Sequence, residues 1–544
     1  MAVTKTTKTK HTWDGQDDVA RNAHAPLSTR ITRILASPSP QQLEFLRWIE
    51  QGTGNAELIA VAGAGKTTTL LAAANALPPD VGAYAVVFNR KNADELRARF
   101  PANVTCGTFH SVWSNVLRKH LGVSSLNVDT NKTRSIIERV LPHHTFNDAT
   151  DKAHVHYTHF AYITPLQKLI GYAKNEGMGT MIASNSAAAY ATLIDYHDMD
   201  LADSVDVQEL CTYASQVLTL SGQDTARVDF DDMLWLPLVL DLRAPAREFV
   251  FVDEAQDTNP VQRELVRRMG NDATRYVFVG DPHQAIYGFR GATSDAMEII
   301  AKQFHTTSMP LTVSYRCPKA VVERARQYVS HITAHESAPD GSVETLNALP
   351  VSYLTHGTAV LCRLTAPLVS LCYDLIARRI PSKILGRDLG AGLIALIRQQ
   401  GKGCSTLTHL RARLEQYRAK ELEHWMELQR PEKAMQVDDK VTSIFRVIEH
   451  LGAGESIDAL VEEIAFLFSN DANDGKSGVV LATVHRSKGL EWPHVIIIRP
   501  DMLPLPWAKR DWQREQERNL AYVACTRSKL SLTYVEGERV ALIA

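Results

Sequence analysis

The run ELIAVAGAGKTTTLLAAANAL, residues 57–77, changes its hydrophobic pattern twice within a short distance. ELIAVA has the length and aliphatic content of a buried strand, and KTTTLLAAANAL has the composition of a helix. Between them the small residues Gly63, Ala64 and Gly65 interrupt both patterns. A buried strand that turns directly into a helix is the repeating unit of a parallel sheet, so this run predicts an α/β fold.

The small-residue loop also predicts phosphate binding. Small residues let backbone N–H groups close around phosphate oxygens, and the helix N-terminus adds partial positive charge. Lys66 can then reach the β and γ phosphates of a nucleotide, and Thr67 can ligate Mg²⁺. The strict loop pattern has glycine where this chain has Ala60. The alternative interpretation is a helix start in an ordinary α/β unit.

A second strand pattern, REFVFVDEAQD at 247–257, ends in acidic residues. Asp253 follows the apolar run, so its carboxylate is expected at the carboxyl end of the strand, beside the loop. There Asp253 can hold Mg²⁺ opposite Thr67, and Glu254 can orient and deprotonate an attacking water. The alternative for both acids is a solvated turn that caps the helix beginning near Pro260.

A third strand pattern, YVFVGDPHQAIYGFRGA at 276–292, continues into a glutamine and two aromatic residues. Gln284 lies just past the strand, where it can sense a γ-phosphate. Tyr287 and Phe289 lie near Arg290, and aromatic and cationic residues together form single-strand binding surfaces, where stacking is worth about 1–3 kcal/mol per base. The alternative for the two rings is core packing.

Composition sets broad limits on the whole chain. Its 544 residues exceed what one hydrophobic core supports, so several domains are expected. The net charge of −2 neither supports nor excludes nucleic acid, because a neutral protein can carry a local basic groove. Seven cysteines without a C-x-x-C pair favour a reducing, cytoplasmic environment over a disulfide framework or a zinc site. No apolar stretch is long enough for a membrane span, and the polar start lacks a secretion signal.

Taken together, the motifs resemble those of UvrD/Rep-type superfamily 1 DNA helicases. Nine segments occur in the order of that family, from both ends of the chain, and Ala60 is normal there. The segments are SPSPQQLEFL (37–46), VAGAGKT (61–67), VVFNRKNADELRARF (86–100), GTFHSVW (107–113), FVDEAQD (251–257), GDPHQAIYGFRGA (280–292), LTVSYRCP (311–318), ATVHRSKGLEW (482–492) and ERNLAYVACTRSK (517–529).

The resemblance implies a role for each matching residue. Gln42 would read the adenine, Tyr315 would stack on it, and Glu491 would lie near the ribose. Arg316 and Arg527 would contact the γ-phosphate. The implied catalytic residues are Lys66, Glu254, Gln284, Arg316 and Arg527, and the implied metal ligands are Thr67 and Asp253. The implied ATP-binding residues are Gln42, Ala62, Gly63, Ala64, Gly65, Lys66, Thr67, Thr68, Tyr315 and Glu491. The implied DNA-binding residues are Phe88, Phe109, His110, Tyr287, Phe289 and His485.

Two positions depart from the pattern of the family. Close relatives often have arginine where this chain has Thr68, and that arginine covers the second face of the adenine. With Thr68, base stacking is expected to be one-sided and nucleotide preference looser. Phe289 stands where relatives often have tryptophan, a smaller change because the ring face is kept.

The resemblance also implies two RecA-like domains, each interrupted by a mainly helical insertion. The first RecA-like domain is expected at 31–111 and 228–318, and its insertion at 112–227. The second is expected at 319–399 and 476–544, with a short charged insertion at 400–475, and residues 1–30 are expected to be a polar tail. In the acidic run DFDDM, 229–233, a helix cap is a simpler interpretation than a metal cluster.

The implied function is an ATP-dependent helicase or translocase that moves 3′ to 5′ on single-stranded DNA and acts at single-strand/duplex junctions, with Mg²⁺ as cofactor. The alternative is a DNA-stimulated ATPase that regulates a larger complex, with a nuclease or a replication or repair factor as partner. A binding module with an inactive nucleotide site is disfavoured, because Lys66, Asp253, Glu254 and both arginines are present.

Overall fold

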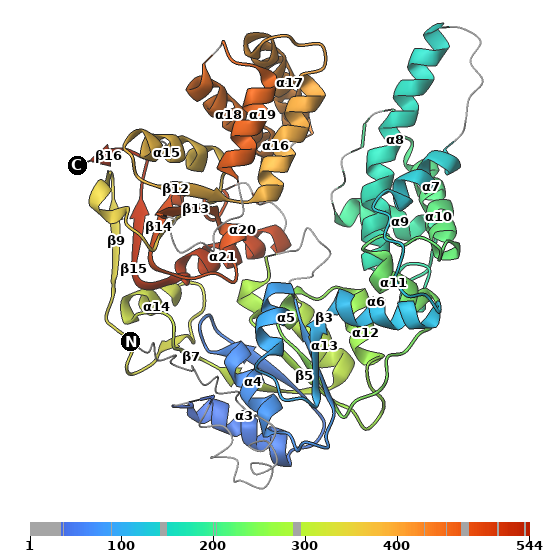
Figure 1. Ribbon diagram of the computed structural model, residues 1–544, viewed down its shortest axis with the longest axis vertical. Helices are drawn as coiled ribbons and strands as arrows, with labels where there is room; N and C mark the ends of the chain where they lie inside the picture. The colour runs from blue at the N-terminus through green and yellow to red at the C-terminus, as the bar shows by residue number, and fades with distance from the viewer. Residues whose placement is uncertain are drawn as a thin grey trace, which may run out of the picture.

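Two six-stranded parallel sheets form the centre of the protein (Figure 1). The computed structural model describes residues 34–35, 37–88, 90–141, 149–197, 199, 201–202, 204–286, 295–428, 430–452, 454–468, 478–506, 508, 511–537 and 540–543. The predicted α/β class with parallel sheets is confirmed. The expected polar tail at 1–30 lies outside the described residues.

The first sheet has the order β3-β2-β4-β5-β1-β6. Its strands are β1 (Asn55–Ala60), β2 (Ala83–Val87), β3 (Val104–Thr108), β4 (Phe249–Val252), β5 (Arg275–Gly280) and β6 (Thr306–Leu311). The helices that accompany it are α3 (Pro40–Gln51), α4 (Lys66–Ala76), α5 (Arg90–Arg97), α6 (Phe109–His120), α11 (Asp232–Val239), α12 (Pro260–Arg267) and α13 (Ala296–Phe304). Because every strand pair is parallel, the carboxyl ends of β1, β4 and β5 meet at one edge.

The second sheet has the order β12-β13-β11-β14-β15-β9. Its strands are β9 (Ser342–Leu346), β11 (Thr358–Cys362), β12 (Ser382–Leu385), β13 (Val479–Thr483), β14 (Trp492–Ile498) and β15 (Ser528–Val535). The helices beside it are α14 (Lys319–Ala325), α15 (Ala366–Ala377), α20 (Val484–Ser487) and α21 (Asp511–Cys525). Two short pairs complete the strands, β7 (Val313–Ser314) with β8 (Thr333–Ala334) and β10 (Leu349–Pro350) with β16 (Leu542–Ile543).

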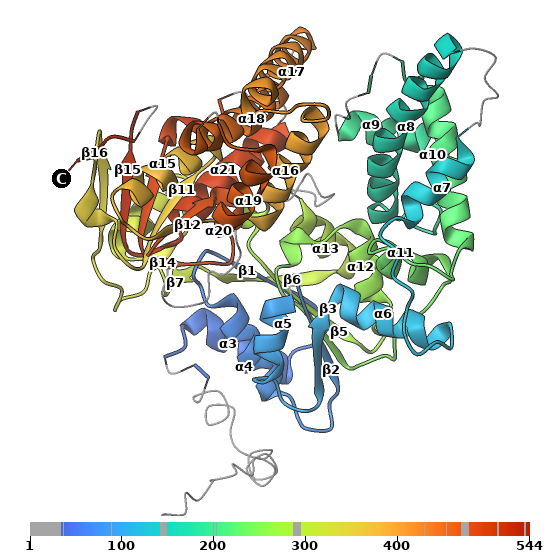
Figure 2. The same ribbon diagram turned by 45° about the horizontal axis from the view of Figure 1, so that its top comes forward.

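Two helical groups interrupt the sheets and rise as separate blocks (Figures 1 and 2). The first lies between β3 and β4 and contains α7 (Lys132–Val140), α8 (Ala149–Asn175), α9 (Ala187–Tyr196) and α10 (Val207–Gln223). The second lies between β12 and β13 and contains α16 (Arg387–Gln400), α17 (Leu407–Glu427), α18 (Pro431–Leu451) and α19 (Ile457–Leu467). Among the described residues, no helix combines the length and the apolar character needed to cross a bilayer.

The two α/β units share one hydrophobic core. Leu58, Ala64 and Leu311 of the first unit belong to the same cluster as Val495, Leu520 and Tyr522 of the second. Burying these side chains together holds the two sheets in one arrangement, because the contact removes apolar surface of both from water. The two units therefore pack against each other beside the loop after β1, and this contact surface is called the seam below.

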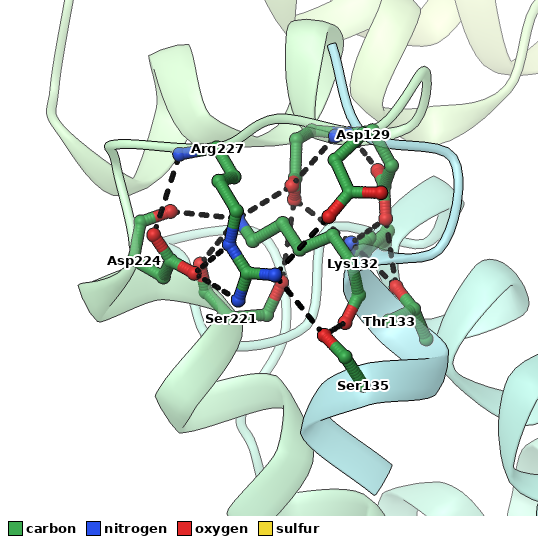
Figure 3. Close-up of polar contacts among 10 residues, drawn as sticks. Asp129, Lys132, Thr133, Ser135, Ser221, Asp224 and Arg227 are labelled. Atoms are coloured by element: carbon green, nitrogen blue, oxygen red, sulfur yellow. Dashed lines mark hydrogen bonds and ion pairs between the residues drawn. The ribbon is translucent and has the colours of Figure 1, made fainter. Parts of the chain in front are cut away.

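A buried charge network joins α7 and α8 of the first helical group to the start of α11, which accompanies the first sheet (Figure 3). The Lys132 ammonium, fully buried, lies 2.6 Å from the Asp232 carboxylate. Lys174 lies 2.8 Å from both Asp229 and Asp232. Arg227 lies at the more exposed edge of the network and donates to Asp224 at 2.8 Å and to Asp129 at 3.1 Å. Two carboxylates of the acidic run DFDDM, Asp229 and Asp232, thus pair with the ammonium groups of Lys132 and Lys174.

The same acidic run caps α11. The Asp229 carboxylate accepts the backbone N–H of Asp232 at 2.8 Å, and Asp232 accepts the backbone N–H of Asp229 at 3.1 Å. Reciprocal bonds of this kind satisfy donors that the first turn of a helix leaves unpaired. The carboxylates therefore serve the helix end and the lysines of α7 and α8 together.

Replacing Asp232 with asparagine leaves two buried ammonium groups short of one carboxylate. Breaking one partner of a buried pair costs about 3–5 kcal/mol, so we expect amides of α7, α8 and α10 to exchange with solvent at least about a hundredfold faster. Glu138→Gln is the control, because its pair with Arg134 is half exposed and such pairs contribute about 0–1 kcal/mol. Equal exchange in the two variants would contradict a structural role for the network.

Candidate nucleotide site and nucleic-acid track

The loop after β1 has the backbone of a phosphate cradle. Gly63 and Gly65 have φ values of 73° and 76°, in the left-handed region that favours glycine, and Gly65 is the N-cap of α4. A Cβ at Gly63 would lie 2.6 Å from the Cβ of Arg316 and from the hydroxyl of Ser314. The loop therefore needs glycine both for its turn and for its close approach to Ser314 at the end of β7 and Arg316 after it.

Four predicted residues meet at the carboxyl edge of the first sheet. Lys66 Nζ lies 3.5 Å from Glu254 Oε2, and the Thr67 hydroxyl donates to Asp253 Oδ2 at 2.9 Å. Gln256 Nε2 donates to the same Glu254 oxygen at 2.5 Å. Glu254 has φ 52°, a left-handed conformation that costs a non-glycine residue about 1–3 kcal/mol and is concentrated at functional sites.

The two acids have opposite electrostatic surroundings. Burial raises the pKa of Asp253, and the neighbouring Glu254 charge raises it further. Burial also acts to raise the pKa of Glu254, but Lys66 and Lys488 outweigh it and hold that pKa below its usual value. Glu254 is therefore ionised at neutral pH and chemically able to accept a proton.

Arg527 lies in the seam, 1% exposed, and faces Gln284 of the first unit. Its Nη2 donates to Gln284 Oε1 at 3.3 Å, and its Nε donates to the Val523 carbonyl at 3.0 Å. The other acceptors that receive its N–H groups in the described structure are the Leu490 carbonyl and the Thr526 hydroxyl. This buried guanidinium is thus solvated by neutral oxygens, and no described carboxylate accepts from it.

Desolvation also changes the acidity of that arginine. Burial, with the like charge of Arg316, lowers the pKa of Arg527 to about 10. The group stays charged at neutral pH, and its lowered pKa measures how poorly the protein alone stabilises the charge. A bound anion would supply the missing stabilisation.

Arg316 reaches the same place from the segment after β7. Its Nε donates to Glu491 Oε2 at 2.6 Å, and Lys529 forms a second ion pair with Glu491. Burial acts to raise the pKa of Glu491, but Lys529 and Arg316 lower it below the usual value. Arg316 lies against Gly63, so Arg316 and its ion-pair partner Glu491 lie beside the loop.

Tyr315 and Gln42 are joined to each other. The Tyr315 hydroxyl donates to Gln42 Oε1 at 3.2 Å, and its backbone N–H donates to the Gly63 carbonyl at 2.8 Å. One face of the Tyr315 ring stacks on His335 with centroids 4.6 Å apart. Gln42 is 2% exposed and forms the capping box of α3, and its Nε2 donates to Thr69 at 2.8 Å. Its amide oxygen therefore accepts from Ser39 and Tyr315, and its Nε2 donates to Thr69.

The sequence motifs did not single out several residues that cross the seam. Lys488 Nζ lies 2.6 Å from Asp257 and donates to the Gln284 carbonyl at 2.5 Å. The hydroxyl of Tyr522 accepts the backbone N–H of Ala62, in the phosphate loop, at 2.8 Å. Asn519 Nδ2 donates to the Ala285 carbonyl at 3.0 Å. Lys488 and Asp257 lie inside two of the matched motif segments, so the sequence indicated that both belong near the site. The sequence did not indicate that they pair with each other.

The residues of the expected nucleic-acid track divide into three groups. Phe88 after β2, His110 at the start of α6 and His485 at the start of α20 are partly exposed. Tyr287 and Phe289 lie outside the described residues. Phe109 is 3% exposed and packs in the core with Trp113 and Leu117, so it is excluded from the track as a correction.

The motifs did not identify one exposed ring that lies beside the expected track. Phe230 is 59% exposed, and its ring meets His110 edge-on with centroids 6.4 Å apart. Burial lowers the pKa of His110, so the imidazole is neutral at neutral pH and presents a ring rather than a charge. Phe230 directly follows Asp229, whose carboxylate pairs with Lys174 and accepts the Asp232 N–H.

Comparison with known proteins covers most of the chain. The UvrD/REP helicase N-terminal domain matches residues 41–305, and the UvrD-like helicase C-terminal domain matches residues 394–537. F-box DNA helicase protein 1 of Schizosaccharomyces pombe is 24% identical over 87% of this chain and 54% of its own length. ATP-dependent DNA helicase PcrA of Leuconostoc citreum is 27% identical over 50% of this chain and 37% of its own.

DNA helicase II of Haemophilus influenzae is 23% identical over 90% of this chain and 83% of its own length. A solved arterivirus nonstructural protein 10 helicase, in complex with DNA, has a TM-score of 0.31 and 12% identity over 89% of this chain and 61% of its own, a weak overall likeness. The chain spans only about half, or less, of the length of the S. pombe and L. citreum relatives. The two matched domains and the helicase relatives identify the chain as a member of the UvrD/Rep family of superfamily 1 DNA helicases.

Proposed function

We propose that the chain is an ATP-driven motor that moves 3′ to 5′ on single-stranded DNA and unwinds duplex ahead of it. One observation carries this proposal: a buried, charged arginine, Arg527, lies across the seam from Gln284 with only neutral described acceptors. A site of this kind favours a phosphate anion, and Lys66 and the cradle at Gly63 and Gly65 lie on the opposite side of the seam. The relatives named above, which are ATP-dependent DNA helicases, support the same function.

The proposal assigns a step to each residue at the seam. The cradle and Lys66 bind the β and γ phosphates, while Arg316 and Arg527 neutralise the γ-phosphate from the other unit. Glu254 accepts a proton from a water as that water attacks the γ-phosphorus, and the bond to the β–γ bridging oxygen breaks to give ADP and phosphate. Arginines in this position are typically worth about 10³–10⁵ in rate.

A Mg²⁺ ion fits the donors of the site. Thr67 and Asp253 present a hydroxyl and a carboxylate 2.9 Å apart, and both are hard oxygen ligands of the kind Mg²⁺ takes. When bound, Mg²⁺ would neutralise phosphate charge.

Movement along DNA would follow from the opening and closing of the seam during the hydrolysis cycle. If hydrolysis removes the γ-phosphate, the anion that joins the two arginines to Lys66 is lost, and the units can separate. The track residues lie on both units, with Phe88, His110 and Phe230 on the first and His485 on the second. Alternating grip by stacking on the two units converts the cycle into a step along the strand.

We also propose the domain limits. The first RecA-like domain corresponds to 31–111 with 228–318, and its insertion to 112–227; the second corresponds to 319–386 with 476–544, and its insertion to 387–475. The position of α16 supports an earlier start for the second insertion, because Gly390 of that helix lies against Phe468, at the end of α19. Arg387, where α16 begins, is then the natural first residue of the insertion.

A second candidate is a regulatory ATPase subunit that needs a protein partner, such as a nuclease or a replication or repair factor. The observation in its favour is apolar exposure on the second insertion, where Phe466 is 72% and Met426 is 59% exposed. Unwinding that requires an added partner, with DNA-stimulated ATP hydrolysis by the chain alone, would favour this candidate.

Lys66→Ala should abolish ATP hydrolysis and weaken nucleotide binding, because the ammonium group contacts the phosphates. Glu254→Gln should leave ATP bound but lower the turnover rate by about 10²–10⁴-fold, since general-base contributions have that size. Single-turnover hydrolysis and filter binding of labelled ATP separate the two effects. Glu44→Gln, an exposed change on α3, is the control, and wild-type turnover in Glu254→Gln would refute the assigned base.

Lys488→Met should lower DNA-stimulated turnover by at least about tenfold, because the buried Asp257 carboxyl loses its ion-pair partner and the Gln284 carbonyl loses its donor. The double variant with Asp257→Asn should lose no more than Lys488→Met alone, since contacting residues are not additive. Lys319→Met is the matched control, because its pair with Asp340 is exposed. Full activity of Lys488→Met would show that the seam does not depend on this pair.

The direction of movement is tested with the chain alone and two tailed duplexes. Unwinding of the duplex with a 3′ single-stranded tail, and little unwinding of the one with a 5′ tail, is the expected outcome. A preference for the 5′ tail would overturn the polarity. ATP turnover that does not respond to single-stranded DNA would overturn the motor itself.

A further inference from the structure

One aromatic contact joins the first helical insertion directly to the second α/β unit. Tyr196, the last residue of α9, faces Trp512, the second residue of α21. Their ring centroids are 6.5 Å apart and their planes differ by 21°, which is the geometry of an offset-stacked pair. Tyr196 is 40% exposed and Trp512 is partly exposed, so neither ring is part of a hydrophobic core.

The contact continues into the insertion as a row of rings. The Tyr196 ring meets His197 edge-on at 5.0 Å, and His197 stacks on Tyr172 of α8 at 3.7 Å with nearly parallel planes. Burial lowers the pKa of His197 to about 4, so this ring stacks as the neutral imidazole at neutral pH. Trp512 is therefore linked to the long helix α8, and not to one exposed side chain alone.

The other end of α21 enters the nucleotide site. Asn519 bonds to the Ala285 carbonyl, Tyr522 accepts the N–H of Ala62 in the phosphate loop, and Arg527 follows two residues after the helix ends. Trp512 and Tyr522 are ten positions apart, which is about 15 Å along a helix. A shift at Trp512 is transmitted along this one element, because a helix is stiff over such a length.

The insertion is connected to the nucleic-acid track in the same way. Tyr190 and Leu193 of α9 belong to the hydrophobic cluster that contains Phe109 and Trp113 of α6. His110, a residue of the proposed track, lies on α6 between those two side chains. The insertion therefore shares one hydrophobic cluster with α6 and contacts α21 through Tyr196.

We propose that the Tyr196–Trp512 stack is a coupling contact, through which the first helical insertion positions α21 and so sets how far Tyr522 and Arg527 close on the phosphate loop. The inference rests on the proposed motor function. Both rings are positioning residues, because neither touches the nucleotide or the strand. Loss of the stack lowers the share of molecules with a closed seam and leaves the groups that bind ATP and DNA unchanged.

The test compares Tyr196→Ala, Trp512→Ala and the double variant in DNA-stimulated ATP hydrolysis. We expect each single change to lower kcat by about threefold to tenfold, the upper range for one aromatic pair, with KM for ATP and the Kd for single-stranded DNA changed less than about twofold. The double variant should lose no more than either single variant, since both changes remove one contact. Trp512→Phe should keep most of the activity.

Tyr353→Ala is the control, because its ring is 37% exposed and its hydroxyl contacts only Glu344 among the described hydrogen bonds. It should match the unchanged chain. Additive losses in the double variant, or wild-type kcat in both alanine variants while the unchanged chain responds to DNA, would overturn the coupling contact and leave the motor intact. No response to DNA in the unchanged chain would overturn the motor, and the coupling contact with it.

Discussion

The seam between the two α/β units depends on a buried ion pair that neither unit can satisfy alone. Lys488 and Asp257 have side chains that are 7% and 2% exposed, and the same ammonium binds the Gln284 carbonyl. Removing either partner would leave the other group buried without its counter-charge, at a cost of about 3–5 kcal/mol. The Lys488 ammonium and the Arg527 guanidinium therefore both bond to Gln284, one at its backbone carbonyl and one at its side-chain amide.

Buried charge is used in two different ways in this chain. In the network at the first insertion, Lys132 and Lys174 are matched by Asp229 and Asp232, so the charges compensate one another and the joint is rigid. At the seam, Arg527 has neutral described acceptors and a lowered pKa. The first arrangement is complete without a ligand, whereas the second gains stability when an anion arrives. This difference separates a structural joint from a site that can drive movement.

The parts of the protein that local sequence determines were predictable. Each strand that leads to a catalytic group is a short apolar run followed by small or acidic residues, so the cradle, Asp253, Glu254 and Gln284 could be located from pattern. Phe109 shows the limit of motif matching: Phe109, Trp113 and Leu117 recur at helical spacing, which indicates a buried stripe. That spacing was a better guide to Phe109 than its place in a motif. The pairing of Lys488 with Asp257 joins residues 231 positions apart and depends on how the units pack.

Gln42 shows how a residue implied to read a base can have another use at the same time. Ser39 and Gln42 have the spacing of a capping box, and the structure contains that box together with bonds to Tyr315 and Thr69. A base read by Gln42 would have to replace some of these bonds, so the net gain from reading its edge is small. With Thr68 in place of a second stacking group, the remaining base contact is one face of Tyr315, supported from behind by His335. If Tyr315 stacks on the base as the family resemblance implies, most of the energy that holds the nucleotide comes from its phosphates, which are also the part that changes during hydrolysis.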